Sequence, residues 1–181
     1  MTKKTFAQEV VGMKLKKTFA QDVVRMKLTK LNFNVQKTKN NFDAIAPNGD
    51  KYLVLVRGRH RTEGPTRSKQ DEHLTIKLIN ESGEYLLDNA PPNTYLGVVV
   101  IKAVSEQVEI IIAPFRDILK INGYFESGRR DICYVRMKDE YLSKYANMPN
   151  KLVYDSEPLS NWRDLYGRCG VSESPAESKR Q

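Results

Sequence analysis

Residues 42–58, FDAIAPNGDKYLVLVRG, decide how the chain is expected to fold. Residues 42–46 form a short strand candidate, and PNGD at 47–50 is a strong turn signal. The Asn48-Gly49 pair suits a tight hairpin. Residues 52–56 are a near-continuous apolar run, as expected of a strand buried on both faces. The stretch predicts a hairpin whose second strand lies inside a sheet.

Before this hairpin, the chain opens with a duplicated segment. KKTFAQEVVGMKL at 3–15 returns as KKTFAQDVVRMKL at 16–28. Each copy spaces Phe, Val and Met like one stripe of a helix. A period of 13 residues turns a helix by roughly 220° beyond whole turns, so one straight helix shows the two stripes on nearly opposite sides.

The duplication leaves two arrangements open. The helix breaks near Gly12 or the Lys16–Lys17 pair, or a single helix packs its first stripe on another chain, giving a homodimer. Residues 31–35 alternate apolar and polar side chains and predict a strand. We therefore predict that the second copy packs on the sheet, with Phe19, Val23 and Met26 buried.

Downstream, the apolar pattern predicts further strands and short helices. These are a hairpin over 73–88 that turns at 81–83, neighbouring strands at 96–103 and 108–113, a helix at 115–121, a short edge strand at 132–137, and helix with loop over 139–166. The expected organisation is an extra helical copy at 1–17, an α/β domain at 18–171 and a disordered tail at 172–181.

Charge points to a polyanionic partner. Lys and Arg number 30 against 22 Asp and Glu, a formal net charge of +8. Residues 57–69, RGRHRTEGPTRSK, carry five cations and one acid and are expected to form a basic loop that contacts phosphates. A solvated loop is the alternative. The predicted nucleic-acid-binding residues are Arg57, Arg59, Arg61, Arg67 and Lys69.

Several protein classes find no support in the sequence. No apolar run approaches the roughly 18 residues of a membrane span, and the charged N-terminus does not resemble a signal peptide, so we expect a cytoplasmic protein. The two cysteines and two histidines lack the close pairing of a zinc site. Tyrosines among basic residues in the C-terminal third can stack on bases, but half-buried core positions are the expectation we favour.

The order of helix, strand, hairpin, basic segment and further strands resembles the PD-(D/E)XK nuclease superfamily, which includes restriction enzymes and Holliday-junction resolvases. The resemblance runs over residues 18–119. Residues 42–46 look like the family's Asp-bearing strand and 52–58 like its catalytic strand, while GVVVIKAVSEQ at 97–107 and VEIIIAPFRDIL at 108–119 look like the strands that follow. The resemblance implies a restriction-endonuclease-like α/β fold, a mixed sheet flanked by helices, and a DNA partner.

The resemblance also implies a site, with departures. Asp43 matches the family's metal-binding Asp, whereas the Glu or Gln position falls on Leu55 and the Lys position on Arg57. Leu55 has no oxygen for a metal, and Arg57 cannot give up a proton near neutral pH. Asp22 (Glu9 in the first copy) stands where some members add an acid. The implied catalytic residues are Asp43 and Arg57, and the implied Mg²⁺ ligands are Asp43 and Asp22.

Three functions follow as hypotheses. The first is a nucleic-acid-binding protein on an endonuclease-like fold whose cleavage is altered or lost. The second is an active Mg²⁺-dependent DNA endonuclease with a substituted metal site. The third is a non-enzymatic assembly protein that dimerises through the duplicated helix.

Overall fold

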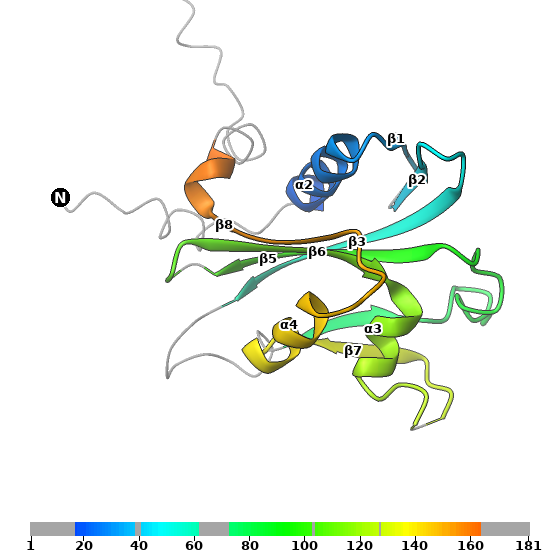
Figure 1. Cartoon of the computed structure of the whole chain (residues 1–181). Helices are drawn as coiled ribbons and strands as arrows, with labels where there is room; N and C mark the ends of the chain where they lie inside the picture. The colour runs from blue at the N-terminus through cyan, green and yellow to red at the C-terminus, as the bar shows by residue number, and fades with distance from the viewer. Residues whose placement is uncertain (1–16, 39–40, 62–72, 103, 127, 164–181) are drawn as a thin grey trace, which may run out of the picture.

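A six-stranded mixed sheet forms the centre of the protein (Figure 1). The computed structural model describes residues 17–38, 41–61, 73–102, 104–126 and 128–163. The strand order is β1-β2-β3-β5-β6-β8, and neighbours are antiparallel except for the parallel pair β3–β5. The strands are β1 (Asn34–Lys37), β2 (Asn41–Ile45), β3 (Lys51–Arg61), β5 (Thr94–Lys102), β6 (Gln107–Pro114) and β8 (Val153–Pro158).

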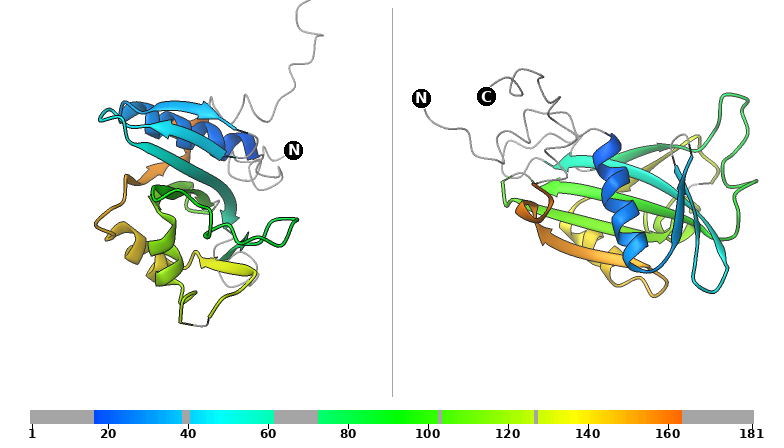
Figure 2. Two further views of the ribbon diagram at one scale, coloured as in Figure 1. Left: turned by 90° about the vertical axis from the view of Figure 1, so that its right-hand side faces the viewer. Right: turned by 90° about the horizontal axis from the view of Figure 1, so that it is seen from above.

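Helices and a second small sheet cover the two faces of the central sheet. Helix α2 (Lys17–Lys30) packs on one face (Figure 2). The antiparallel pair β4 (His73–Lys77) and β7 (Ile132–Arg136) covers the other face with α3 (Phe115–Ile121) and α4 (Asp139–Ala146). A 3-10 turn, η2 (Leu159–Trp162), follows β8. None of the helices in these ranges is long and apolar enough to cross a membrane.

The predicted hairpin is confirmed. Gly49 has a φ of 91°, a left-handed conformation that glycine adopts without strain, and its N–H donates to the Ala46 carbonyl at 2.9 Å. The Asp50 N–H donates to Asn48 Oδ1 at 3.0 Å. This local chemistry places β2 antiparallel to β3, with Asp43 opposite Leu53.

The parallel pair β3–β5 needs a crossover, which is usually a helix. Here the crossover contains β4, which pairs with β7 in the small sheet instead of joining the central one. The prediction of an α/β protein with a mixed sheet flanked by helices is confirmed at this level. The extra helical copy at 1–17 lies outside the described residues, apart from Lys17, where α2 begins.

Side-chain alternation divides the core between the two faces of the sheet. Val54 and Val56 of β3 face α2, whereas Leu55 between them faces β4–β7 and α3. The same alternation in β5 and β6 puts Val99 and Ile110 on the α2 side and Val100 and Ile111 on the other. The central strands are therefore buried on both faces, which accounts for their continuous apolar sequences.

The second repeat copy packs on the sheet, as predicted, but with a shifted stripe. Phe19 and Val23 are buried, whereas Met26 is 42% exposed, so that part of the prediction is wrong. The buried stripe continues from Val23 to Lys27 and Leu28. Lys27 follows Val23 by four residues and therefore returns to nearly the same face of the helix. Met26 follows Val23 by only three residues and lies on the flank of that face.

Four other expectations were wrong in detail. The strand expected at 31–35 begins at Asn34, because Asn32 takes a left-handed φ of 62° after α2 and delays the extended chain. Residues 57–61, expected in the basic loop, continue β3. The expected hairpin at 73–88 reduces to one bridge, Ile79 to Tyr85, since β4 pairs with β7. Strand β8 lies inside a stretch expected to be helix and loop.

Cys133 provides a test of the packing beneath the small sheet. Its side chain is buried, and burial raises the pKa of its thiol to about 11. At pH 8 only about one thiol in a thousand is then ionised. In a Cys169→Ser variant, we expect Cys133 to react with a thiol reagent only as fast as the protein opens, and fully in denaturant. Rapid reaction of the native protein would contradict the burial of β7 on the sheet.

Candidate nucleic-acid interface

The residues implied by the nuclease resemblance are partly separated in the structure. Asp43 and Arg57 face the same side of the sheet, because Asp43 lies opposite Leu53 and Arg57 follows Leu53 by an even number of residues. However, Asp43 lies opposite Leu53, four residues before Arg57, and four strand residues span about 13 Å. Leu55 is buried in the core on that face. Asp43 and Arg57 therefore do not lie side by side.

Asp22 and Asp43 do not meet either. Asp22 belongs to α2, which packs over Phe42 and Ala44 of β2. Asp43 lies between those two residues, so its exposed side chain points to the opposite face. Within the described ranges, no three Asp, Glu, His or Cys side chains come close enough to share a metal ion. The expected pairing of these two carboxylates around one Mg²⁺ is therefore not formed.

The predicted phosphate-binding cations begin as part of the sheet. Arg57 donates from Nη1 to the Val56 carbonyl at 2.8 Å, and burial lowers the pKa of its guanidinium. Arg59 follows on the same face of β3, and the backbone of Arg61 pairs with Lys102 of β5. Arg67 and Lys69 lie outside the described residues. The first cations of the segment are therefore held on a strand instead of a loop.

A different set of cations and aromatic rings gathers on the outer side of the small sheet. In β4 and β7 every second residue is buried, which leaves His73, Tyr134 and Arg136 on the outward face. His73 pairs directly with Arg136 across the two strands. Tyr134 is 50% exposed, and its ring meets that of His73 edge to face at 4.9 Å. A tyrosine this exposed contributes little to the core and offers its ring to a ligand.

Helix α4 extends this surface. Its residue Tyr141 accepts a hydrogen bond at its hydroxyl from Arg136 Nη1. The cationic groups of Arg136 and Lys144 lie 5.2 Å and 4.8 Å from the centre of the Tyr141 ring. Such cation–π contacts hold a ring and its cations in fixed relation. A cavity of about 540 Å³ lies here, and Glu140 lines it beside the cations and the rings. We define the basic–aromatic face as His73, Tyr134, Arg136, Lys138, Tyr141 and Lys144.

A polar cluster links the start of α4 to the central sheet. Lys102 of β5 forms ion pairs with Glu109 of β6 at 3.1 Å and with Asp139, the first residue of α4, at 3.3 Å. Glu109 is buried and also accepts a hydrogen bond from the Tyr154 hydroxyl at 2.6 Å. Burial and the hydrogen bond to this carboxylate raise the pKa of Tyr154. Because Asp139 is 76% exposed, its ion pair contributes little on its own, and α4 is held mainly by its buried residues Leu142 and Tyr145.

The same cluster brings the cationic end of β3 to this end of the molecule. Arg61, the last residue of β3, is paired with Lys102, which contacts Asp139 next to Lys138. Residues 62–72 join this end of β3 to His73, the first residue of β4. The two described residues that flank 62–72 in the sequence, Arg61 and His73, are thus the end of β3 and the start of β4.

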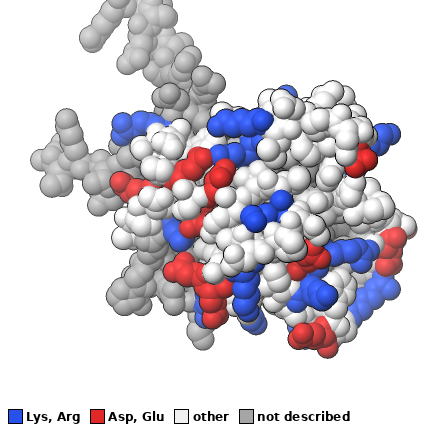
Figure 3. All heavy atoms as spheres, in the orientation of Figure 1, with Lys and Arg blue, Asp and Glu red and all other residues white. Residues whose placement is uncertain are grey.

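The charge pattern of the surface is mixed. In Figure 3, cationic and anionic side chains are interspersed over the part of the molecule where α3 and α4 lie in Figure 1. This view shows no single basic field across the protein. Recognition of a polyanion would then depend on a local set of cations, such as the basic–aromatic face, more than on long-range attraction.

Sequence reasoning noticed these tyrosines but favoured core positions for them. That expectation holds for Tyr145, which is buried, and fails for Tyr134. The alternation of apolar and polar residues in HLTIK and ICYVR indicates which side chains point outward. Taken as a pair, the two strands put Leu74, Ile76, Cys133 and Val135 inward and the aromatic and basic residues outward. The pairing of β4 with β7, 59 residues later in the chain, could not be seen locally.

No protein-family model, curated protein or solved structure matches the chain.

Proposed function

We propose that the protein binds nucleic acid through the basic–aromatic face and that the bound stretch is unpaired. The observation that carries the proposal is the grouping of the exposed Tyr134 ring and the half-buried His73 ring with Arg136 and Lys138 on one outward surface, where Glu140 is the one anion among the described lining residues. Aromatic side chains stack on bases that are free of their own stack, and neighbouring cations bind the backbone phosphates. The net charge of +8 favours the same class of partner.

DNA is the partner that the nuclease resemblance implies, and the proposal adopts it. Binding in this proposal does not require cleavage. Leu55 offers no oxygen to a metal, and Asp22 and Asp43 lie on opposite faces of the sheet. The positions that the resemblance assigns to metal binding are thus separated from one another, whereas the aromatic and cationic residues are brought together.

Fluorescence anisotropy with a labelled single-stranded 20-mer and its duplex tests the proposal. We expect tighter binding of the single strand. Tyr134→Ala should weaken it about tenfold, since stacking on one ring is worth about 1–3 kcal/mol. Neutralising Arg136 and Lys138 by glutamine should also flatten the salt dependence, by about 0.7 in slope for each phosphate that the protein no longer neutralises.

The matched control is the pair Arg25→Gln and Lys30→Gln on α2, which removes the same charge from the opposite face. This pair should leave the salt slope nearly unchanged. If the control weakens binding as much as the Arg136 and Lys138 pair does, net charge and not the basic–aromatic face accounts for binding.

A separate assay measures cleavage, by incubation of supercoiled plasmid with Mg²⁺ or Mn²⁺, with and without chelator. Chelator-sensitive nicking would favour the endonuclease hypothesis.

A further inference from the structure

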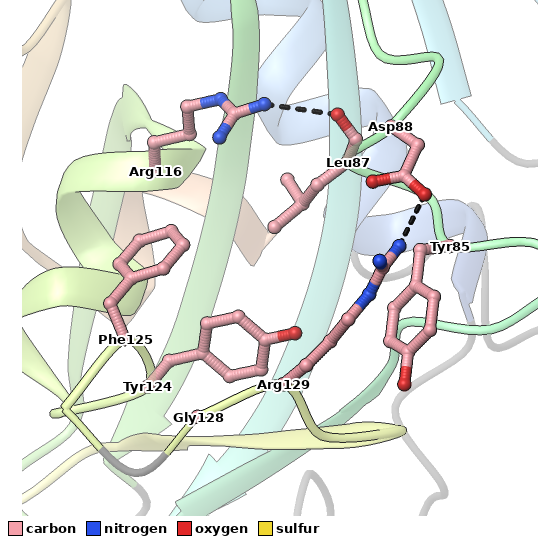
Figure 4. A pocket seen from close by; sticks show the side chains of 8 residues that line it. All are labelled: Tyr85, Leu87, Asp88, Arg116, Tyr124, Phe125, Gly128 and Arg129. Carbon is pink, nitrogen blue, oxygen red and sulfur yellow. Dashed lines mark hydrogen bonds and ion pairs between the residues drawn. The ribbon is translucent and has the colours of Figure 1, made fainter.

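A second cavity, of about 330 Å³, lies beside α3 (Figure 4). Three short segments form it. Tyr85 and Asp88 come from the turn after β4, Arg116 from α3, and Tyr124, Phe125 and Arg129 from the segment between α3 and β7. The cavity shares no residue with the basic–aromatic face.

The interior of this cavity is aromatic. Tyr124 is buried and donates from its hydroxyl to the Arg130 carbonyl at 3.1 Å, which holds its ring in place. Phe125 packs against it edge to face, with ring centres 5.1 Å apart, yet remains 48% exposed. Figure 4 shows the Phe125 and Tyr124 rings between the two arginines. A large apolar ring left half exposed at the wall of a cavity suits a flat apolar or aromatic ligand.

Two guanidinium groups, those of Arg116 and Arg129, line the same cavity as these rings (Figure 4). Arg116 donates from Nη2 to the Leu87 carbonyl at 2.9 Å, a bond that uses one of its five N–H donors. Arg129 lies flat against Tyr85, with Cζ 3.6 Å from the ring centre, and forms an ion pair with Asp88. Guanidinium groups fixed in this way bind phosphate oxygens through paired, charge-assisted hydrogen bonds.

The Arg129–Asp88 ion pair is open to exchange. The two side chains are 53% and 57% exposed, and an ion pair at that exposure contributes little stability. A phosphate can therefore replace the Asp88 carboxylate at Arg129 without a large loss. Asp88 then acts as a competitor that lowers the affinity for an anion while keeping the arginine in position.

We infer that this cavity binds a nucleoside monophosphate, with the base against Phe125 and the phosphate at the arginines. A volume of about 330 Å³ is at the small end of ligand pockets and suits one nucleotide better than a dinucleotide. The inference goes beyond the proposed function and does not depend on it, because it concerns a free small molecule at a separate site.

Isothermal titration with adenosine monophosphate, adenosine and inorganic phosphate tests the inference. We expect the monophosphate to bind with a dissociation constant of about 1 mM or tighter, and each fragment alone to bind much more weakly. Arg116→Gln should weaken the monophosphate about tenfold and leave adenosine unaffected. Asp88→Asn should strengthen the monophosphate several-fold. Phe125→Ala should weaken both the monophosphate and adenosine.

Arg25→Gln on α2 is the matched control and should leave all three titrations unchanged. Equal effects of Arg116→Gln and Arg25→Gln would overturn the inference, as would no binding of the monophosphate by the wild type. Phosphotyrosine carries a ring and a phosphate in a different arrangement, and its binding in place of the nucleotide would also overturn it. None of these results depends on oligonucleotide binding, so failure here is distinguishable from failure of the proposed function.

Discussion

Replacing Phe19 by alanine should lower the free energy of unfolding by about 3–4 kcal/mol. Phe19 is among the largest fully buried side chains, and it joins α2 to the sheet through a core that includes Val54 and Val56. Truncation removes the buried ring and leaves a cavity that surrounding side chains fill only in part. Urea unfolding of the variant and the wild type, followed by circular dichroism, measures the loss.

Met26→Ala is the control within the same repeat copy. Because Met26 is largely on the outer flank of α2, its truncation should cost less than about 1 kcal/mol. Phe6→Ala, at the matching position of the first copy, is also expected to cost clearly less than Phe19→Ala. Equal losses from Phe19→Ala and Met26→Ala would contradict the packing of α2 described above.

Lys27→Met should cost about 2 kcal/mol at neutral pH. Lys27 is only 7% exposed and connects α2 to β8, with Nζ 2.7 Å from Asp155 and 2.5 Å from Glu157. Its ammonium also lies 5.6 Å from the centre of the Trp162 ring. Methionine keeps the length of the side chain but leaves two carboxylates without their cation. Since both carboxylates are partly exposed, the cost should be lower than for a fully buried pair.

The cost of Lys27→Met should depend on pH in a defined direction. Burial on its own lowers the pKa of Lys27, but hydrogen bonds and charge from Asp155 and Glu157 outweigh it and raise the pKa above its ordinary value of 10.5. A raised pKa in the folded state stabilises the protein fully below 10.5, and this stabilisation is lost as the pH rises through the folded value. The difference in unfolding free energy should therefore shrink above that range. A difference that grows with pH would contradict the ion-pair assignment.

Strong local signals were enough to predict part of the fold. The Asn48-Gly49 turn and the apolar runs of β3, β5 and β6 are short-range features, and each predicted its element correctly. Strand β8 was different. Its sequence, VYDSEP, has little apolar character, and it becomes a strand because it pairs with β6 and because Lys27 binds two of its acids. Tertiary contacts make this segment a strand, and no local sequence pattern predicts it.

The candidate site was harder to predict for a related reason. The resemblance directed attention to Asp43 and Arg57, which the register separates along the strands. The basic–aromatic face depends on β4 and β7 coming together and on the packing of Leu142 and Tyr145, which holds α4 against the core. Each of these contacts joins segments far apart in the sequence. The net charge and the arginine-rich segment at 57–69 support the proposal of a polyanionic partner but do not locate its site.

Photo-crosslinking of a bound single-stranded oligonucleotide that carries 5-iododeoxyuridine tests the central claim most directly. After irradiation and digestion, mass spectrometry identifies the peptides joined to the oligonucleotide. We predict crosslinks in the peptides that contain Tyr134 and Tyr141, with His73 and the adjoining segment 62–72 as further sites. Crosslinks confined to α2, on the opposite side of the sheet, would contradict the account.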